Sequence, residues 1–334
     1  MSAIACFRPA WWLDNPHLQT IYPALLRRPP TLLRRRERLA TPDADFIDLD
    51  WYGDGDAPLA ILLHGLSGSS HSSYILGLQP ALLAQGFASV AMNFRGCSGE
   101  SNRLARCYHS GETEDVDFLY RTLRQRYPSR AIAAVGFSLG GNVLLKWLGE
   151  RGGQLDLFAA VAVSVPLVLS ECATRLDYGF SKIYRDRLLT ELKQYMQDKL
   201  RHLQAIGAGR EVAKLRELGD LSAIRSFWQY DDRVVAKLHG FAGVDDYYRC
   251  SSSRQFLPKI RVPTLLVQAA DDPFMTPAVL PEPGELSPQV TLELHANGGH
   301  VGFVGCNRGL KIDYWLDGRI PRFLREQRPA DTNA

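Results

Sequence analysis

Short apolar runs recur along the first half of the chain, and a segment with helical spacing follows each of the first three. The apolar runs lie at residues 58–63, 88–94, 131–135 and 158–165. They carry no charged residue, which is the pattern of strands buried on both faces. The segments with the pattern of helices lie at residues 74–85, 110–127 and 143–148. This alternation predicts an α/β fold, a mostly parallel central sheet with helices on both faces.

The pattern changes between residues 167 and 259, where charged residues at helical spacing replace the buried strands. An insertion of this length is too long for a structureless loop, so we expect a helical cap over the strand ends. Its aromatic residues could line a substrate cavity or pack the cap on the body; they are Phe227, Trp228, Tyr230, Phe241, Tyr247 and Tyr248. The sheet pattern returns at 262–267 and 290–294. The expected organisation is an N-terminal extension (1–44), a core (45–166 and 260–334) and a cap (167–259).

The two ends of the chain give weaker patterns. Prolines interrupt any long helix in the first 44 residues, so an extended segment is expected there. Residues 46–52, FIDLDWY, alternate apolar and acidic positions, which suits an exposed edge strand. Residues 312–327 predict a terminal helix with a break near Pro321, followed by a loose tail at 330–334. Within the core, the helix at 74–85 is expected to break and restart at Pro80. Ser110 is expected to be the N-cap of the helix at 110–127.

The most informative stretch is Ile132–Asn142, IAAVGFSLGGN, an apolar run followed by the start of a helix. A side-chain-bearing residue at so sharp a turn adopts a strained backbone, which needs small residues two positions before and after it. Gly136 and Gly140 stand at those positions around Ser138. The pattern predicts a nucleophile elbow that exposes the Ser138 hydroxyl in front of a helix N-terminus.

A serine hydroxyl needs a neighbouring base, and that base needs a third group to orient it. His300 follows the last predicted strand in a glycine-rich loop, and Asp271 and Asp272 follow the strand before it. Parallel strands end at one edge of the sheet, so these loops can converge on Ser138. Asp272 is the preferred acid because Pro273 makes its turn rigid, and Asp271 is the alternative. Each residue by itself has an alternative interpretation: Asp271 and Asp272 could form an Asx turn that bonds only its own backbone, and His300 could be a loop histidine without a role.

The oxyanion of an acyl-transfer reaction also needs N–H donors. The backbone N–H of Leu139, directly after Ser138, is the first candidate. The loop after the strand at 58–63 offers the N–H of Leu66 as the second. His64 is expected to be a structural member of that loop, and His17 and His109 to brace loops.

Composition and charge exclude several other classes of protein. The net charge of +3 is too small to indicate a nucleic-acid partner. The basic segment at 25–39 is expected to be a solvated face, with peripheral membrane or polyanion contact as the alternative. There is neither a signal-peptide pattern nor a run of 18 apolar residues, so no integral membrane segment is expected. Six scattered cysteines without metal-ligand spacing favour reduced thiols, a cytoplasmic location and no structural metal; they are Cys6, Cys97, Cys107, Cys172, Cys250 and Cys306.

Several stretches, spread over nearly the whole chain, resemble a known family. They are NPHLQTI (15–21), HGLSGSS (64–70), NFRGCSGE (93–100), YHSGETED (108–115), GFSLGGN (136–142), HGFAGVDDYY (239–248), DDPF (271–274) and GGHVGF (298–303). They are similar to the α/β-hydrolase fold superfamily, in the branch of YheT-like hydrolases and ABHD-type carboxylesterases. The resemblance implies a Ser138–Asp272–His300 triad without a metal or organic cofactor.

The same resemblance implies a small-molecule acyl ester as the substrate, either short- to medium-chain or lipid-like. Cys97 in the loop at 93–100 and the length of the cap are details that could alter the pocket. Two other functions stay open at this point. One is transfer of the acyl group to an alcohol at the same site, and the other is binding of an acyl ligand without turnover, since a fold alone does not establish chemistry.

Overall fold

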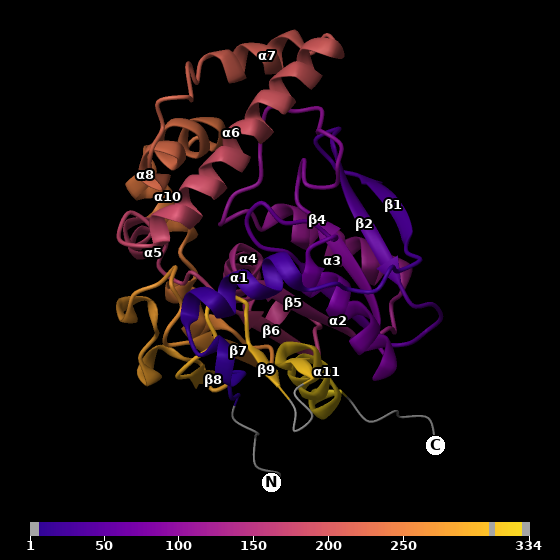
Figure 1. Cartoon of the computed structure of the whole chain (residues 1–334). Coiled ribbons are helices and arrows are strands. Elements are labelled where there is room, and N and C mark those ends of the chain that lie inside the picture. The colour runs from indigo at the N-terminus through magenta and orange to yellow at the C-terminus, as the bar shows by residue number, and fades with distance from the viewer. Residues whose placement is uncertain (1–6, 307–310, 329–334) are drawn as a thin grey trace.

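The computed structural model describes residues 7–306 and 311–328. An eight-stranded sheet runs through the molecule in the order β1-β2-β4-β3-β5-β6-β7-β8 (Figure 1). All pairings from β4 to β8 are parallel, whereas β1 and β2 pair antiparallel with their neighbours. The strands are β1 (Arg35–Ala40), β2 (Phe46–Tyr52), β3 (Leu59–Leu63), β4 (Ala88–Asn93), β5 (Ile132–Phe137), β6 (Ala159–Val163), β7 (Thr264–Ala269) and β8 (Val290–His295). The predicted α/β architecture with a mostly parallel sheet is confirmed.

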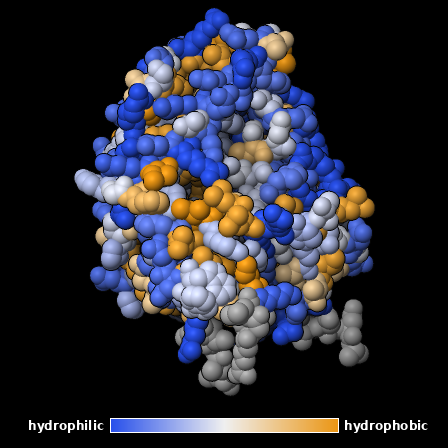
Figure 2. Space-filling view, viewed as in Figure 1, coloured by the Kyte–Doolittle hydropathy of each residue, from blue (hydrophilic) through white to orange (hydrophobic). Residues whose placement is uncertain are grey.

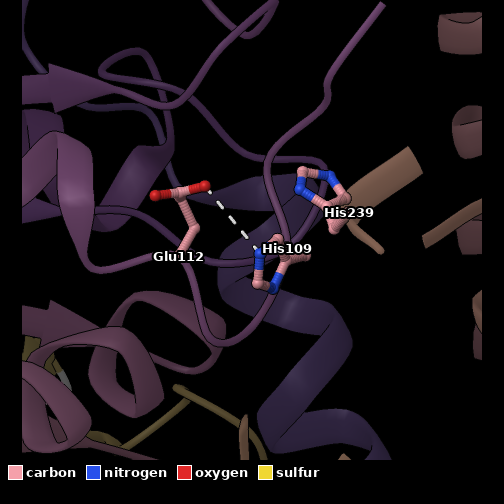
Figure 3. A group of neighbouring side chains, drawn as sticks. All are labelled: His109, Glu112 and His239. Carbon is pink, nitrogen blue, oxygen red and sulfur yellow. Dashed lines mark ion pairs between the residues drawn. The ribbon is translucent and has the colours of Figure 1, made fainter. Parts of the chain in front are cut away.

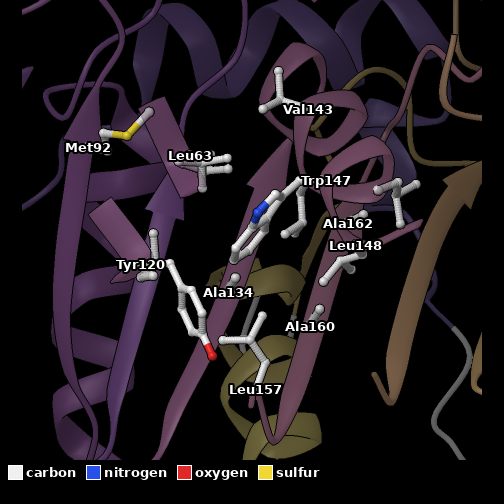
Figure 4. Packing of buried hydrophobic residues seen from close by; sticks show 14 of the residues in the cluster. Leu63, Met92, Tyr120, Ala134, Val143, Trp147, Leu148, Leu157, Ala160 and Ala162 are labelled. Carbon is white, nitrogen blue, oxygen red and sulfur yellow. The ribbon is translucent and has the colours of Figure 1, made fainter. Parts of the chain in front are cut away.

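Helices cover both faces of this sheet. They are α2 (Ser73–Ala84), α3 (Glu114–Arg126), α4 (Leu139–Arg151) and α11 (Trp315–Gln327). Alternate residues of β3 divide between two cores: Leu59, Ile61 and Leu63 pack with α3 and α4, whereas Ala60 and Leu62 pack with α2 and α11. The period of two residues in a strand produces this division. Trp147 of α4 fills the first core beside the sheet (Figure 4).

The segment between β6 and β7 is helical throughout its regular elements, as its charge pattern predicts. It contains α5 (Leu169–Arg175), α6 (Ser181–Ala205), α7 (Gly209–Arg216), α8 (Phe227–Tyr230), the π-helical η3 (Asp231–Ala236), α9 (Lys237–His239), α10 (Val244–Ser251) and η4 (Ser253–Lys259). These helices share a hydrophobic core of their own. In Figure 1, α6 and α7 project beyond the sheet as a separate layer.

The N-terminal segment differs from the extended entry that its prolines predict. It holds η1 (Trp11–Leu13), the helix α1 (Pro16–Leu26) and the strand β1. Pro16 occupies the first position of α1, where the missing N–H costs no helical hydrogen bond, and Pro23 lies buried inside the helix. The tail at 330–334, predicted to be loose, lies outside the described residues.

The prediction that 46–52 is an exposed edge strand is wrong. β1 covers β2, and six of the seven residues of β2 are buried. Arg36 and Arg38 of β1 reach across to Asp50 and Asp48, and each guanidinium contacts both carboxylate oxygens of its acid. The acidic positions that read as solvent-facing are therefore neutralised by arginines from the basic segment. This pairing leaves fewer free cations in residues 25–39 than the sequence suggests.

Three local expectations also differ from the structure. α2 and α11 continue through Pro80 and Pro321 without a break. Both helices are held by packing on the sheet, which overrides the local cost of proline. Thr113, not Ser110, precedes α3. The strand β10 (Ile312–Tyr314), which pairs with β9 (Val304–Cys306) in a short second sheet, occupies the start of the segment predicted as terminal helix.

Two further findings concern membrane spans and the cysteines. Within residues 7–306 and 311–328, no helix is long and apolar enough to cross a membrane. Five cysteines are free thiols, namely Cys97, Cys107, Cys172, Cys250 and Cys306, while Cys6 lies outside the described residues.

A buried arginine joins the loop after β4 to the rest of the body. Arg95 is 2% exposed and contacts Asp115 with two nitrogens at 2.7 and 2.8 Å. It also binds Asp43 and lies 3.4 Å from buried Asp45. Removing one partner of a buried ion pair leaves the other charge without compensation, which is strongly destabilising.

We expect Arg95→Met to lower the free energy of unfolding by about 3–5 kcal/mol. Arg201→Met is the control, because this exposed side chain pairs with the exposed Asp198 on the cap, and its loss is expected to cost about 1 kcal/mol or less. Urea unfolding followed by circular dichroism measures both. Equal midpoints for Arg95→Met and the parent protein would contradict the assignment of a structural ion pair.

Candidate active site

The turn between β5 and α4 has the geometry that the glycine pattern predicts. Ser138 has φ 51° and ψ −119°, a strained conformation for a residue with a side chain. A Cβ on Gly136 would lie 2.4 Å from the carbonyl oxygen of Gly140, and a Cβ on Gly140 would lie 2.5 Å from that of His64. Real Cβ atoms do not approach so closely, so both positions require glycine. The turn leaves Ser138 at the carboxyl edge of the sheet.

The structure brings three of the predicted residues into one hydrogen-bonded chain. Nε2 of His300 lies 2.9 Å from Oγ of Ser138, and Nδ1 of His300 lies 2.8 Å from Oδ2 of Asp272. Asp271 points elsewhere, because its Oδ1 accepts the backbone N–H of Gly299 at 2.9 Å. Of the two candidate acids, Asp272 is the one in contact with the imidazole.

The imidazole has little freedom to leave this position. The ring of Phe274 stacks on it with centroids 4.1 Å apart and an interplanar angle of 3°. The carboxylate of Asp272 is itself fixed, because its Oδ1 accepts the N–H of Phe274 at 2.9 Å. A buried, hydrogen-bonded carboxylate beside a stacked ring sets the orientation that a general base needs.

The two candidate oxyanion donors lie beside Ser138. Leu63 of β3 pairs with Gly136 of β5, so the loops that follow the two strands leave the sheet together. Leu139 is the first residue of α4, where a backbone N–H has no acceptor within the helix. Among the described residues, the N–H of Leu66 has no acceptor either. Leu66, Leu139 and Ser138 all line the same pocket.

This pocket has a volume of about 400 Å³, within the usual range for small-molecule sites. Its walls come from α1, from the loops that hold Ser138 and His300, and from the cap. Apolar residues of the cap that line it are Leu169, Ala173, Leu176, Leu188 and Phe227. Figure 2 shows hydrophobic residues gathered over α1 beside a hollow in the surface. The Ser138 hydroxyl therefore lies in a largely apolar cavity between body and cap.

The loop that carries His300 is held by residues that the sequence analysis did not single out. The N–H of His300 donates to Oγ1 of Thr20 at 2.9 Å, and Gln19 accepts the N–H of Val304 at 2.7 Å. A Cβ on Gly302 would lie 2.4 Å from the carbonyl oxygen of Gln19. In the sequence, only the stretch NPHLQTI (15–21) pointed to Gln19 and Thr20: it formed part of the family resemblance, but no function was predicted for it. The N-terminal helix thus positions the loop of the imidazole.

His64 has the structural role expected of it. Its Nε2 accepts the N–H of Phe94 at 3.1 Å, so the ring proton resides on Nδ1, which donates to the carbonyl of Gly65 at 2.8 Å. Burial lowers the pKa of His64 to about 4. The neutral imidazole of His64 thus uses both ring nitrogens in hydrogen bonds that link the loops after β3 and β4.

A second group of side chains, His109, Glu112 and His239, joins the loop before α3 to α9 (Figure 3). Their ligand atoms lie within 4.8 Å of one another, and burial lowers the pKa of both histidines, that of His239 to about 4. However, Gly111 donates its N–H to Nδ1 of His109, which places the ring proton on Nε2, the nitrogen facing Glu112 at 3.8 Å. Arg106 also occupies Glu112. Hydrogen bonds within the protein account for this cluster, and we assign no metal to it.

Comparisons with known proteins agree with this fold. A family model described as alpha/beta hydrolase fold matches residues 58–305. YheT of Escherichia coli (strain K12), whose name describes an esterase, is 42% identical over 97% of this chain and 94% of its own length. Phospholipase ABHD3 of Mus musculus is 30% identical over 89% of this chain and 73% of its own length. The Pyrococcus furiosus esterase Pf2001 has a similar fold, with a TM-score of 0.56, 17% identity, and coverage of 90% of this chain and 97% of that structure.

Proposed function

Because the chain belongs to the α/β-hydrolase family, we propose that it is a serine carboxylesterase that cleaves acyl esters through Ser138. The observation that carries this proposal is the hydrogen-bonded chain from Ser138 through His300 to Asp272. Relatives named esterase and phospholipase support an ester as the substrate.

In the proposed reaction, Ser138 Oγ attacks the ester carbonyl and His300 Nε2 takes its proton. Asp272 keeps the proton of Nδ1 in place and stabilises the imidazolium that forms. The N–H groups of Leu66 and Leu139 donate to the oxyanion of the tetrahedral intermediate. His300 returns the proton to the departing alkoxide, and water activated by the same imidazole then hydrolyses the acyl-enzyme.

The shape of the pocket supports a short- to medium-chain or lipid-like acyl group. Four residues in α5 or directly after it line the pocket, and they follow one another at spacings of three and four positions. They are Leu169, Cys172, Ala173 and Leu176. These spacings place the side chains on one face of a helix, so they form an apolar wall along the cavity. A hydrocarbon chain of a few carbons gains from leaving water in such a place.

The direct test uses p-nitrophenyl esters from acetate to laurate with the purified protein, following release of the phenol. We expect kcat/KM to rise with acyl length and then fall once the chain outgrows a cavity of about 400 Å³. A fluorophosphonate probe should label Ser138 in the folded protein. Absence of both turnover and labelling would refute the esterase and favour a protein that only binds an acyl ligand.

A further inference from the structure

One carboxyl group in the pocket has no part in the proposed reaction. Asp231 begins η3, directly after α8, and lines the same cavity as Ser138. The π-helical turn that it opens is a rare conformation that occurs frequently at functional sites. Phe227 and Tyr248 of the cap line the cavity with it.

The hydrogen bonds of Asp231, which lines the cavity, leave acceptor atoms unused. Oη of Tyr248 donates to Oδ2 of Asp231 at 2.7 Å. Among the described residues, Oδ1 of Asp231 has no hydrogen-bond partner. The phenol oxygen of Tyr248, having donated its proton, can still accept a hydrogen bond. Oδ1 of Asp231 and Oη of Tyr248 are therefore two acceptors close together in a largely apolar pocket. A ligand group that donates a hydrogen bond would satisfy them.

Asp231 has no positively charged partner in the described residues that would explain an acidic side chain at this position. No described lysine, arginine or histidine forms an ion pair with it, and burial raises its pKa to about 7. An acidic side chain without a cation is costly in such a place, and uncompensated polar groups in a pocket are characteristic of binding sites.

We propose that Asp231 and Tyr248 form a subsite that binds a hydroxyl group of the ester substrate. The inference rests on the proposed esterase function and narrows its substrates to hydroxyl-bearing esters. The hydroxyl belongs either to the alcohol part, as in a monoester of a polyol, or to the acyl chain, as in a hydroxyacyl ester.

A hydroxyl fits these two residues better than an ammonium group does. A hydroxyl both donates and accepts, so it can bind Asp231 in its ionised and in its protonated form. An ammonium group only donates and requires the ionised form. The other charged residues that line the cavity are already paired, Arg187 with Glu191 and Arg27 with Asp317, so the preference for a hydroxyl rests on Asp231 and Tyr248 themselves.

The test compares matched esters with and without the hydroxyl. For the alcohol part, glycerol monohexanoate is compared with propyl hexanoate; for the acyl part, p-nitrophenyl ω-hydroxyhexanoate is compared with p-nitrophenyl hexanoate. We expect one pair to show a preference of about 10- to 100-fold in kcat/KM for the hydroxyl-bearing ester. Asp231→Leu should remove this preference, and Asp231→Asn, which retains an acceptor, should keep part of it.

Asp232→Asn is the matched control, since the neighbouring Asp232 is exposed and accepts the N–H of Val244 outside the pocket. It should keep the full preference. Equal kcat/KM within both pairs, a preference that survives Asp231→Leu, or a stronger preference for p-nitrophenyl ω-aminohexanoate would each overturn the hydroxyl subsite.

A failure of the esterase proposal itself would look different, because the protein would then turn over none of these esters. In that case, calorimetry with the monohexyl ether of glycerol and with its dimethylated derivative tests the subsite without catalysis. Tighter binding of the free diol that Asp231→Leu abolishes supports the subsite. Equal binding of the two ethers, together with equal binding of ethyl hexanoate and ethyl ω-hydroxyhexanoate, refutes it.

Discussion

Replacing Ser138 with alanine is expected to lower kcat for p-nitrophenyl esters by about 10⁵- to 10⁶-fold, the scale seen when a serine nucleophile is removed. The variant should retain its fold, because the Ser138 hydroxyl is hydrogen bonded only to His300 among the described residues. Alanine also suits the tight turn, where its Cβ replaces that of serine. The measurement is kcat by phenol release, with the circular dichroism spectrum of the variant as the check on folding.

Ser222→Ala provides the control for this experiment, since Ser222 is an exposed residue of the cap with its hydroxyl bonded to Asp220. Its kcat should equal that of the parent protein. Retained esterase activity in a correctly folded Ser138→Ala protein would refute Ser138 as the nucleophile. It would also remove the support for every other role proposed around it.

Asp272→Asn is expected to lower kcat by about 10⁴-fold. An amide beside Nδ1 of His300 can present N–H instead of a carboxylate oxygen, which favours the wrong tautomer and removes the charge that stabilises the imidazolium. The loss should appear in kcat at unchanged folding, measured with the ester of optimal length.

Asp271→Asn is the matched variant, one residue away with the same change in charge. Its Oδ1 accepts the N–H of Gly299, and an asparagine oxygen can accept the same bond, so we expect kcat within about tenfold of the parent. A larger loss for Asp271→Asn than for Asp272→Asn would show that the acid has been assigned to the wrong residue.

Local patterns were sufficient wherever the determinants are close in sequence. Uncharged runs of five to eight residues predict β3 to β6 because a doubly buried strand tolerates no charge. Gly136 predicts the turn at Ser138 because the clash that it avoids is with the carbonyl oxygen of Gly140, four residues away. Gly140 fits the same local pattern, although the clash that it avoids is with His64, which is distant in sequence. Ser138, Asp272 and His300, chosen by their places at strand ends, are hydrogen bonded in the structure, while their chemical roles stay predictions.

The sequence was misleading where the deciding partner is distant. Asp48 and Asp50 read as solvent-facing because nothing nearby in sequence announces that Arg38 and Arg36 of β1 will pair with them. Ser110 has the chemistry of an N-cap, yet its N–H donates to Oη of Tyr247 in the cap. A contact between Ser110 and the cap depends on how the cap packs on the body. The spacing of apolar residues along the sequence does not predict that packing.

The contact between α1 and the loop of His300 has a consequence for the order in which the protein acquires activity. Thr20 and His300 are 280 positions apart, so their contact closes nearly the whole chain into one loop. We expect a contact of such long sequence separation to form late, because the entropy of closing the intervening chain must be overcome first. A nascent or refolding chain can therefore complete its sheet and its serine turn while the imidazole is still unplaced. If His300 is the base that we propose, activity is expected to appear only after Thr20 and His300 have come together.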